Sequence, residues 1–449
     1  MNQPSLAIEH ILQVVEKLPL PRHYWVAYSG GMDSTALLSM LSQHRDKLKA
    51  ELVAVHVNHQ LSANADHWER HCRAFCQERE IRCEVVSINV RDGREGSLEA
   101  WARELRYAVL ETFMQQDDIL MTAHHRDDLA ETVIQQLLRG GGPEGLSAMP
   151  ESRRFGPGWL VRPLLAYYRQ QIEDYVRSSQ LAWVEDESNT DQGIDRNFIR
   201  NKVMPCVKER WPSAVDILWR VSRLQADAVE IQHEMAGQDL TRARGNSGAK
   251  LRLSAVAKLS WPRQRNLLRY WIRKNGQRVP AMSVIDKIIN ELMYARPDGT
   301  PCIRWADAQI RRYRDDIYIM PFSAFEPPAA GATYLWSLEK PMAIPGGRLE
   351  AGLTTGGGIR KDLLQDDTVE VRFRSGGESI RPAGRRETHE LKKLFQEAAV
   401  PPWERDIIPL LYVGNELAAV AGHWIADKFC ASGDVAGWEI FFVNARSGA

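Results

Sequence analysis

The sequence predicts an α/β fold in which a doubly wound parallel sheet is followed by a helical domain and a small mixed α/β C-terminal domain. Three features predict this organisation. Short apolar runs alternate with segments of helical length up to residue 212, long helical patterns come next, and short strands punctuated by glycines follow from residue 333. Strands separated by helices of this length favour a parallel sheet, because each connection can cross a face of the sheet.

The first domain is expected to alternate strands and helices. Pro19 and Pro21 end the first helical pattern, and a short apolar strand then leads into the loop Ser29-Gly30-Gly31. The expected order is helix 7–18, strand 25–28, helix 35–41, strand 51–58, helix 66–79, strand 83–88, helix 98–115 and strand 118–123. Ligands of doubly wound sheets bind at the carboxyl ends of the strands. The loops after the first, second and fourth strands are therefore expected to meet in one crevice.

Two further domains follow, and we expect the three domains to cover residues 1–212, 213–326 and 333–449. The second domain is mainly helical, with helices at 214–236, 259–274 and 283–295 and a strand-like segment at 309–320. The stretch 327–331, which contains proline, alanine and glycine, is expected to be a linker.

The composition indicates a folded protein without an overall electrostatic preference. Hydrophobic residues make up 44% and charged residues 26%, and 58 basic residues balance 58 acidic ones. A nucleic-acid surface must therefore be local. Glu9 and Glu16 interrupt the N-terminal region where a signal peptide would be apolar, no apolar stretch is long enough to span a bilayer, and the six cysteines lack disulfide spacing. We expect a cytoplasmic location and no membrane partner.

Residues 29–34 have the composition of a phosphate-binding loop between a strand and a helix. Gly30 and Gly31 let backbone amides turn toward a phosphate, Ser29 and Ser34 add hydroxyl donors, and a helix N-terminus favours an anion. No lysine follows the glycines, so the Walker pattern and cleavage at the terminal phosphate lose support. Asp33 is expected to position a magnesium ion on the nucleotide.

The segment 123–142 is expected to form a second wall of the same crevice. As a helix it has an apolar stripe of Ala130, Val133, Ile134 and Leu137. Its opposite, polar face consists of His124, Asp128, Glu131, Gln135 and Arg139. A solvated surface helix gives the same pattern, but the position after a strand's carboxyl end favours a binding face. The adjacent side chains of His124 and His125 point apart, which argues against a zinc site.

Two levels of resemblance follow from these residues. Ser29-Gly30-Gly31-Met32-Asp33-Ser34 resembles the SGGxDS signature of the PP-loop ATP pyrophosphatases, which cleave ATP between its α and β phosphates and transfer AMP to an oxygen of the substrate. The segment His124-His125-x-Asp127-Asp128-x-x-Glu131-Thr132 resembles, more narrowly, the tRNA(Ile)-lysidine synthetase family.

The narrower resemblance extends over nearly the whole chain. It is also carried by His56-Val57-Asn58-His59, Ala102-Arg103 with Arg106-Tyr107, Asp186-x-Ser188-Asn189, Arg196-Asn197-x-Ile199-Arg200, Lys392-Lys393-Leu394-Phe395 and Val400-Pro401-Pro402-Trp403. One departure is Gln60-Leu61-Ser62, where the family often has Gly-Leu-Arg. A glycine turn and a basic contact are in doubt at that position.

The resemblance implies a ligase with a PP-loop type of fold that uses ATP and magnesium. Members of the family adenylylate the C2 oxygen of the wobble cytidine of a minor isoleucine tRNA with a CAU anticodon. The side-chain amine of free lysine then displaces AMP and gives lysidine. The expected products are therefore lysidine, AMP and pyrophosphate, and the expected partners are that tRNA and lysine. A homodimer is possible, but the sequence does not determine the oligomeric state.

The resemblance and the residue chemistry together give each position a role. Asp128 and Glu131 are expected to attract the cationic lysine, and Asp33 to hold magnesium. The ATP-binding set is Ser29, Gly30, Gly31, Met32, Asp33, Ser34, His56 and Arg106. The catalytic set is Asp33, Asp128, Glu131 and Arg196. The tRNA-binding set is Arg139, Arg200, Arg381, Arg385, Lys392 and Lys393.

Two other functions are compatible with the same fold. Related PP-loop enzymes put sulfur into tRNA, and Cys72 and Cys76 lie four residues apart on a predicted helix with His67 and His71 nearby. No Cys-x-x-Cys occurs in the sequence, which weakens that alternative. A catalytically dead tRNA-binding module is the other alternative, and the intact residues 29–34 with Asp128 and Glu131 argue against it.

Overall fold

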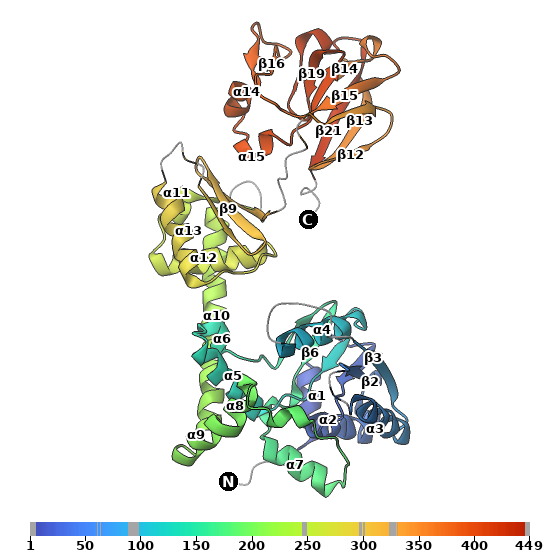
Figure 1. Cartoon of the computed structure of the whole chain (residues 1–449), viewed down its shortest axis with the longest axis vertical. Coiled ribbons are helices and arrows are strands. Elements are labelled where there is room, and N and C mark those ends of the chain that lie inside the picture. The colour runs from blue at the N-terminus through green and yellow to red at the C-terminus, as the bar shows by residue number, and fades with distance from the viewer. Residues whose placement is uncertain are drawn as a thin grey trace. The chain divides into compact units, whose positions relative to one another are not determined.

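The chain forms two compact units, Met1–Gln232 and His233–Ala449 (Figure 1). The computed structural model describes residues 6–60, 62, 64–88, 98–244, 249–295, 299, 301–322, 329 and 331–444. The predicted linker at 327–331 lies largely outside the described residues. The division into three domains at the expected boundaries stays a prediction.

The first unit is built around a six-stranded sheet. Its strands are β1 (His23–Ala27), β2 (Glu51–Asn58), β3 (Arg82–Ser87), β4 (Ile119–Met121), β5 (Ser152–Phe155) and β6 (Gly158–Val161). The spatial order is β3-β2-β1-β4-β6-β5, and every pair is parallel except the β5–β6 hairpin. The strand order reverses between β1 and β4, so the loops after these strands lie at the topological switch point, where such sheets bind ligands.

The helices of this unit connect and cover the strands. They are α1 (Ile8–Val15), α2 (Met32–Gln43), α3 (Ala65–Glu78), α4 (Leu98–Thr112), α5 (Arg126–Leu138), α6 (Pro143–Leu146), α7 (Arg169–Ser178), α8 (Asp195–Phe198) and α9 (Met204–Arg210). A π-helical turn, Ile199–Val203, joins α8 to α9. The long helix α10 (Ala214–Ala243) contains the boundary between the two units. The predicted parallel α/β fold is confirmed.

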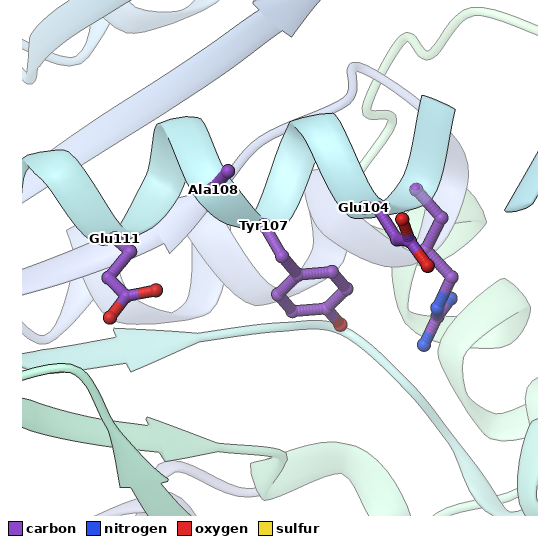
Figure 2. Close-up of a pocket in the computed structure, with 5 residues that line it drawn as sticks. Glu104, Tyr107, Ala108 and Glu111 are labelled. Atoms are coloured by element: carbon purple, nitrogen blue, oxygen red, sulfur yellow. The ribbon is translucent and has the colours of Figure 1, made fainter. Parts of the chain in front are cut away.

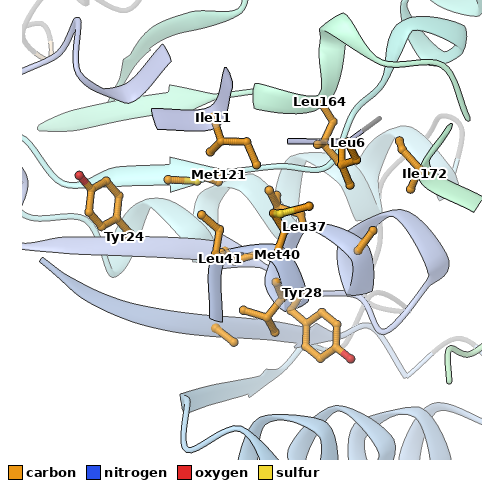
Figure 3. Close-up of a cluster of buried hydrophobic side chains, with 14 of the residues drawn as sticks. Leu6, Ile11, Tyr24, Tyr28, Leu37, Met40, Leu41, Met121, Leu164 and Ile172 are labelled. Atoms are coloured by element: carbon orange, nitrogen blue, oxygen red, sulfur yellow. The ribbon is translucent and has the colours of Figure 1, made fainter. Parts of the chain in front are cut away.

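The central strands pack apolar side chains on both faces of the sheet. In β1, Tyr24 and Val26 belong to one buried cluster and Trp25, which lies between them, to another. The first cluster lies under α1, α2 and α7, and Figure 3 shows Leu37 and Met40 of α2 among its side chains. Burial on both faces explains why these strands are short, nearly continuous apolar runs.

The second unit begins with helices and a four-stranded antiparallel sheet. Its elements are β7 (Lys250–Arg252), α11 (Leu253–Val256), α12 (Trp261–Lys274), α13 (Met282–Tyr294), β8 (Cys302–Trp305), β9 (Ala308–Tyr313) and β10 (Asp316–Pro321). The predicted single strand-like segment at 309–320 is instead a hairpin of β9 and β10. Its turn contains Arg314 at φ 54°. The turn signal in the sequence is weak, because Asp315 is a common turn residue but Arg314, which adopts the positive φ, is not.

The remainder of the second unit is mostly antiparallel sheet. The strands are β11 (Thr333–Ser337), β12 (Met342–Ile344), β13 (Gly347–Thr355), β14 (Ile359–Arg360), β15 (Thr368–Arg372), β16 (Ser379–Ile380), β17 (His389–Glu390), β18 (Leu410–Val413), β19 (Glu416–Val420), β20 (Trp424–Ile425) and β21 (Ala436–Asn444). Two short helices, α14 (Leu391–Glu397) and α15 (Pro402–Arg405), accompany them. Among the described residues, no helix combines the length and the apolar character that crossing a membrane requires.

Candidate active site

The loop after β1 has a shape that requires glycine at its first turn. Gly30 has φ +81°, and a Cβ atom there would lie 2.9 Å from both Cys72 Sγ and Val184 Cγ2. The backbone N–H of Val184 donates to the Gly30 carbonyl at 3.0 Å. The loop is therefore held between α3 and the segment before α8, and a side chain at position 30 would displace it.

The hydroxyl groups of the loop lie next to the N-terminus of α2. Ser29 Oγ lies 3.1 Å from Ser34 Oγ and accepts from the Gly31 backbone N–H at 3.3 Å. The Ser34 hydroxyl also lies 3.0 Å from the Gly31 carbonyl oxygen, to which it donates. Met32 packs its side chain into the core, so only its backbone faces the loop. The arrangement is suited to a polyphosphate, because hydroxyls and helix N–H groups converge there.

Asp33 presents one carboxylate oxygen without a protein partner. Its Oδ1 is buried and accepts no hydrogen bond from any residue that the structure describes, and its Oδ2 lies 3.7 Å from His125 Nε2. Burial raises the pKa of Asp33, although the neighbouring His125 opposes that shift. A buried oxygen that lacks a donor fits a hard cation such as magnesium, which prefers carboxylate and phosphate oxygens.

A histidine that the sequence-based assignment of site residues left out lies at the start of α5. His125 is the N-cap of this helix and is 1% exposed. Its Nδ1 accepts from the Asp128 backbone N–H at 3.3 Å, and its own backbone N–H donates to Asp128 Oδ2 at 3.1 Å. The sequence gives only a weak signal for this reciprocal capping box, because the usual pattern has serine or threonine followed three residues later by glutamate or glutamine. His125 Nε2 also lies 3.3 Å from Asp128 Oδ2, so the ring lies between Asp33 and Asp128.

The polar face of α5 is buried against two arginines. Asp128 and Glu131 are 6% and 4% exposed. Arg196 and Arg200 each place Nη2 2.7 Å from Asp128 Oδ1. Arg200 also donates to both oxygens of Glu131, at 2.7 and 2.9 Å, whereas Arg196 Nε lies 3.4 Å from Glu131. Four of the predicted site residues thus form one cluster.

The electrostatics of this cluster keep Asp128 ionised. Burial alone would raise the pKa of Asp128, but the neighbouring His125, Arg196 and Arg200 side chains outweigh burial and hold it well below its usual range. The predicted apolar stripe on the other side of α5 is wrong at Leu137, which is 60% exposed. The reason is tertiary, since Ala130 and Ile134 pack against the π-helical turn whereas Leu137 belongs to none of the buried clusters of the described residues.

Two residues of the predicted ATP-binding set, His56 and Arg106, lie near the end of β2 and in the middle of α4. His56 is 5% exposed, and its Nδ1 lies 2.9 Å from the Tyr28 carbonyl oxygen. Burial lowers the pKa of His59 to about 4, and the charge of Arg106 contributes to this shift. Arg106 therefore lies close enough to His59 to repel its proton. The structure therefore brings Arg106 toward the second strand's carboxyl end, while His56 lies beneath the surface.

A cavity of about 510 Å³ runs along α4. It is lined by Arg103, Glu104, Tyr107, Ala108 and Glu111, and Figure 2 shows Glu104, Tyr107 and Glu111 projecting from one side of the helix. The cavity is open and includes none of residues 29–34. Its lining offers two carboxylates and one guanidinium rather than converging donors, so it is not the phosphate site.

Five of the six residues predicted to bind tRNA are exposed, whereas Arg200 is only 27% exposed and belongs to the α5 cluster, where it pairs with Asp128 and Glu131. Arg139 pairs with Asp195 at 3.1 Å in the first unit. In the second unit, Arg381 pairs with Asp427 at 2.6 Å and Arg385 with Glu397 at 2.9 Å. Lys392 and Lys393 of α14 are exposed, and neither forms an ion pair within the described part of the chain.

The cysteines weighed for sulfur transfer are part of the core. Cys72 and Cys76 are at most 1% exposed, and burial raises the pKa of the Cys72 thiol. A thiol of this kind is a poor nucleophile, because the thiolate is the reactive form. Within the described residues, no group of three or more His, Cys, Asp or Glu side chains could hold a metal ion. Sulfur transfer is therefore not favoured.

Comparison with known proteins gives matches along most of the chain. A PP-loop domain matches residues 5–207, a TilS substrate binding domain residues 251–318 and a TilS substrate C-terminal domain residues 369–442. A protein of Coxiella burnetii named tRNA(Ile)-lysidine synthase is 37% identical over 96% of this chain and 96% of its own length. Proteins of the same name from Methylococcus capsulatus and Alkalilimnicola ehrlichii are 40% and 38% identical, over 91% and 95% of this chain and 93% and 96% of theirs.

Proposed function

The chain belongs to the tRNA(Ile)-lysidine synthase family, and on that premise we propose that it uses ATP to join free lysine to C2 of the wobble cytidine of an isoleucine tRNA with a CAU anticodon. One observation carries this proposal. A phosphate loop lies close to a buried carboxylate pair, with His125 between Asp33 and Asp128. The site thus offers donors for a polyphosphate beside acceptors for an ammonium group.

The first step takes place on the phosphate loop. The C2 oxygen of the cytidine attacks the α phosphorus of ATP, the bond to the bridging oxygen breaks, and pyrophosphate leaves. Ser29, Ser34 and the N-terminus of α2 hold the phosphates that become pyrophosphate, because their donors converge there. Asp33 Oδ1 is the oxygen that would hold a magnesium ion, which neutralises charge on the leaving pyrophosphate when bound.

The second step takes place at Asp128 and Glu131. Both carboxylates are already paired with Arg196 and Arg200, so the ammonium of lysine must replace one of these contacts. Arg196 is the one to yield, since its Nε lies 3.4 Å from Glu131 while Arg200 makes two contacts of 2.9 Å or less. The released guanidinium is then free for an RNA phosphate or the base. The ammonium then gives up a proton to solvent, and the neutral amine attacks C2. The bond between C2 and the adenylylated oxygen breaks, so that AMP leaves with that oxygen.

The tRNA is proposed to contact both units. The chain's TilS substrate binding and C-terminal domain matches and the exposed Lys392 and Lys393 support this part of the proposal. Backbone phosphates are the expected ligands of such lysines. A cytoplasmic location belongs to the same proposal, because tRNA and free lysine are both there.

A homodimer is also proposed, and α10 supports it. Ile217, Leu224 and Ile231 lie seven residues apart on this helix and are 40%, 65% and 62% exposed. An apolar stripe at heptad spacing favours a second helix as its partner. Sedimentation tests this part of the proposal. The parent is expected to be a dimer and Leu224→Lys a monomer.

The experiment that tests the function is mass spectrometry of isoleucine tRNA after incubation with ATP and lysine. A mass increase that requires lysine, accompanied by AMP and pyrophosphate, is expected. ADP and phosphate as the nucleotide products would contradict the proposal, because no Walker lysine follows the glycines.

A further inference from the structure

We propose that His125 is a positioning residue that orients the Asp33 carboxylate toward the magnesium ion of bound ATP. The inference rests on the proposed use of ATP and gives a role to a buried side chain that the ligation steps above do not use. His125 comes from the loop after β4, whereas Asp33 comes from the first turn of α2 after β1. The contact therefore joins the two strands that flank the switch point of the sheet.

The helix cap fixes which nitrogen of His125 carries the proton. The backbone N–H of Asp128 donates to Nδ1 at 3.3 Å, so Nδ1 must offer a lone pair. In the neutral ring the proton is then on Nε2. Nε2 lies 3.3 Å from Asp128 Oδ2 and 3.7 Å from Asp33 Oδ2, and no hydrogen bond from it is made within the described residues. The ring therefore directs one N–H donor toward two carboxylates.

The two oxygens of Asp33 have different surroundings. Oδ2 is the oxygen nearer to His125 Nε2, and Oδ1 is buried without a hydrogen-bond partner among the residues that the structure describes. A donor at Oδ2 would restrict rotation of the carboxylate and leave Oδ1 available to a cation. Hydrogen bonds of this kind hold metal-binding carboxylates in one orientation, and catalytic contacts that are long without ligand commonly shorten when it binds.

The choice of histidine at this position supports a role beyond capping. Serine, threonine, aspartate and asparagine are the favoured N-cap residues, and each would accept from the Asp128 N–H with a smaller side chain. Such side chains end near the position of Nδ1 and cannot reach Asp33. A buried imidazole in place of a better cap is explained when its second nitrogen has a function.

Two substitutions separate the cap from the second nitrogen. His125→Asn keeps an acceptor for the Asp128 N–H and removes the donor toward Asp33. His125→Gln carries an amide N–H at about the reach of Nε2, and its cap is poorer. His44→Asn is the matched control, because His44 also bonds its own helix backbone, with Nδ1 3.0 Å from the Met40 carbonyl oxygen, at the far end of α2.

The measurement is calorimetric binding of α,β-methylene ATP, which cannot be cleaved at the proposed bond, over a range of magnesium concentrations without lysine or tRNA. His125→Asn is expected to raise the magnesium concentration for half-maximal binding roughly tenfold or more, with a melting temperature close to that of the parent. His125→Gln should bring the magnesium concentration for half-maximal binding back close to the value of the parent. His44→Asn should leave that concentration at the value of the parent.

The inference is overturned if His125→Asn has the magnesium requirement of the parent, or if it loses binding equally with and without magnesium. Should His125→Asn not fold, His125→Gln decides. A requirement within about threefold of the parent supports the role of the donor, and a tenfold increase overturns it. A parent protein that does not bind the analogue with magnesium would overturn the proposed use of ATP itself, so the two failures are distinguishable.

Discussion

The charged cluster on α5 and the basic surface of the second unit use the same residue types in opposite ways. In the cluster, Asp128 and Glu131 are buried, and their arginine partners are separated from them by 65 to 72 residues along the chain. On the surface, Arg381 and Arg385 form exposed pairs with Asp427 and Glu397. Removing one partner of a buried pair costs about 3–5 kcal/mol, whereas an exposed pair contributes about 0–1 kcal/mol.

This difference shows that the density of charged residues in a sequence does not locate a site. The C-terminal arginines are numerous, but most are neutralised by a nearby acidic residue, as Arg372 is by Glu370 and Arg374 by Asp406. The α5 cluster has only four members, and burial makes each of them depend on the others. Substitutions in the buried cluster are expected to change the rate of the ligation reaction, and substitutions on the surface to change the affinity for tRNA.

The largest effect is expected at Asp33, whose buried Oδ1 has no hydrogen-bond partner among the described residues. Asp33→Asn should lower turnover roughly 100-fold or more, because a charge directed at the magnesium site is worth several kcal/mol in the transition state. Burial raises the pKa of Asp33, so the ionised side chain is less stable in the folded state, and the variant should melt at the same or a higher temperature. Steady-state kinetics and calorimetry measure both effects.

The control for this substitution is Asp46→Asn, which changes an exposed aspartate between α2 and β2. It should alter neither turnover nor melting. Equal loss of activity in both variants would remove the special role of Asp33.

The next largest effect is expected at Glu131, in the buried cluster. Glu131→Gln should raise the KM for lysine roughly tenfold or more and leave binding of ATP nearly unchanged. It should also lower the free energy of unfolding by about 3 kcal/mol or less, because Arg200 loses one of its two carboxylate partners and keeps Asp128. Lysine titrations and urea denaturation measure these quantities.

Glu173→Gln is the matched control, because Glu173 pairs with Arg177 on the exposed side of α7. Its effect on stability should be below about 0.5 kcal/mol. If lysine dependence were unaltered in Glu131→Gln while ATP binding collapsed, the carboxylates would belong to the nucleotide half of the site.

A pH effect is expected from the buried histidines of the first unit. Burial is the main cause that lowers the pKa of His59 to about 4 and of His124 to about 3, below the value near 6.5 of an unfolded histidine. Below pH 6.5 the unfolded chain takes up protons that the folded protein excludes. The stabilisation is therefore complete above pH 6.5 and is lost as the pH falls toward 4.

Urea denaturation at pH 7.5, 6 and 5 tests this expectation. His59→Gln should show a shallower loss of stability over that range than the parent, because it cannot be protonated. Parallel curves for the two proteins would mean that the pKa of His59 is the same in the folded and the unfolded state.

The smallest effect is expected on the basic surface. Lys392→Ala with Lys393→Ala should change the free energy of unfolding by less than about 0.5 kcal/mol and weaken binding of full-length tRNA. The slope of log affinity against log salt should fall by roughly one to two, since each phosphate contact contributes about one. Modification of an isolated anticodon stem-loop should stay near the parent rate.

Lys428→Ala provides the control, because Lys428 is already paired with both oxygens of Glu416 at 2.6 and 2.7 Å. Its salt slope should change less than that of the double variant. Equal losses of the double variant on tRNA and on the stem-loop would place these lysines in folding or in the active site.

Local patterns were sufficient to predict the phosphate loop and four strands of the six-stranded sheet, but not β5 and β6. β2 has the predicted bounds, and β1, β3 and β4 lie within a few residues of the predicted strands, because apolar runs and turn residues depend on neighbours in the sequence. Gly30 was predictable for the same reason, since a turn of positive φ requires glycine. The hairpin at Arg314 was not, because its turn residue carries no such signal.

The sequence by itself determined the order of strands and helices, the loop that can receive phosphates and the residue types around it. Only the tertiary structure decided that Asp128 and Glu131 are buried against Arg196 and Arg200, that Leu137 is exposed, and that His125 faces Asp33. The physical reason is range. Helical and strand periodicity are set within a few residues, whereas the partner of a charge and the burial of a helix face depend on which distant segment packs there.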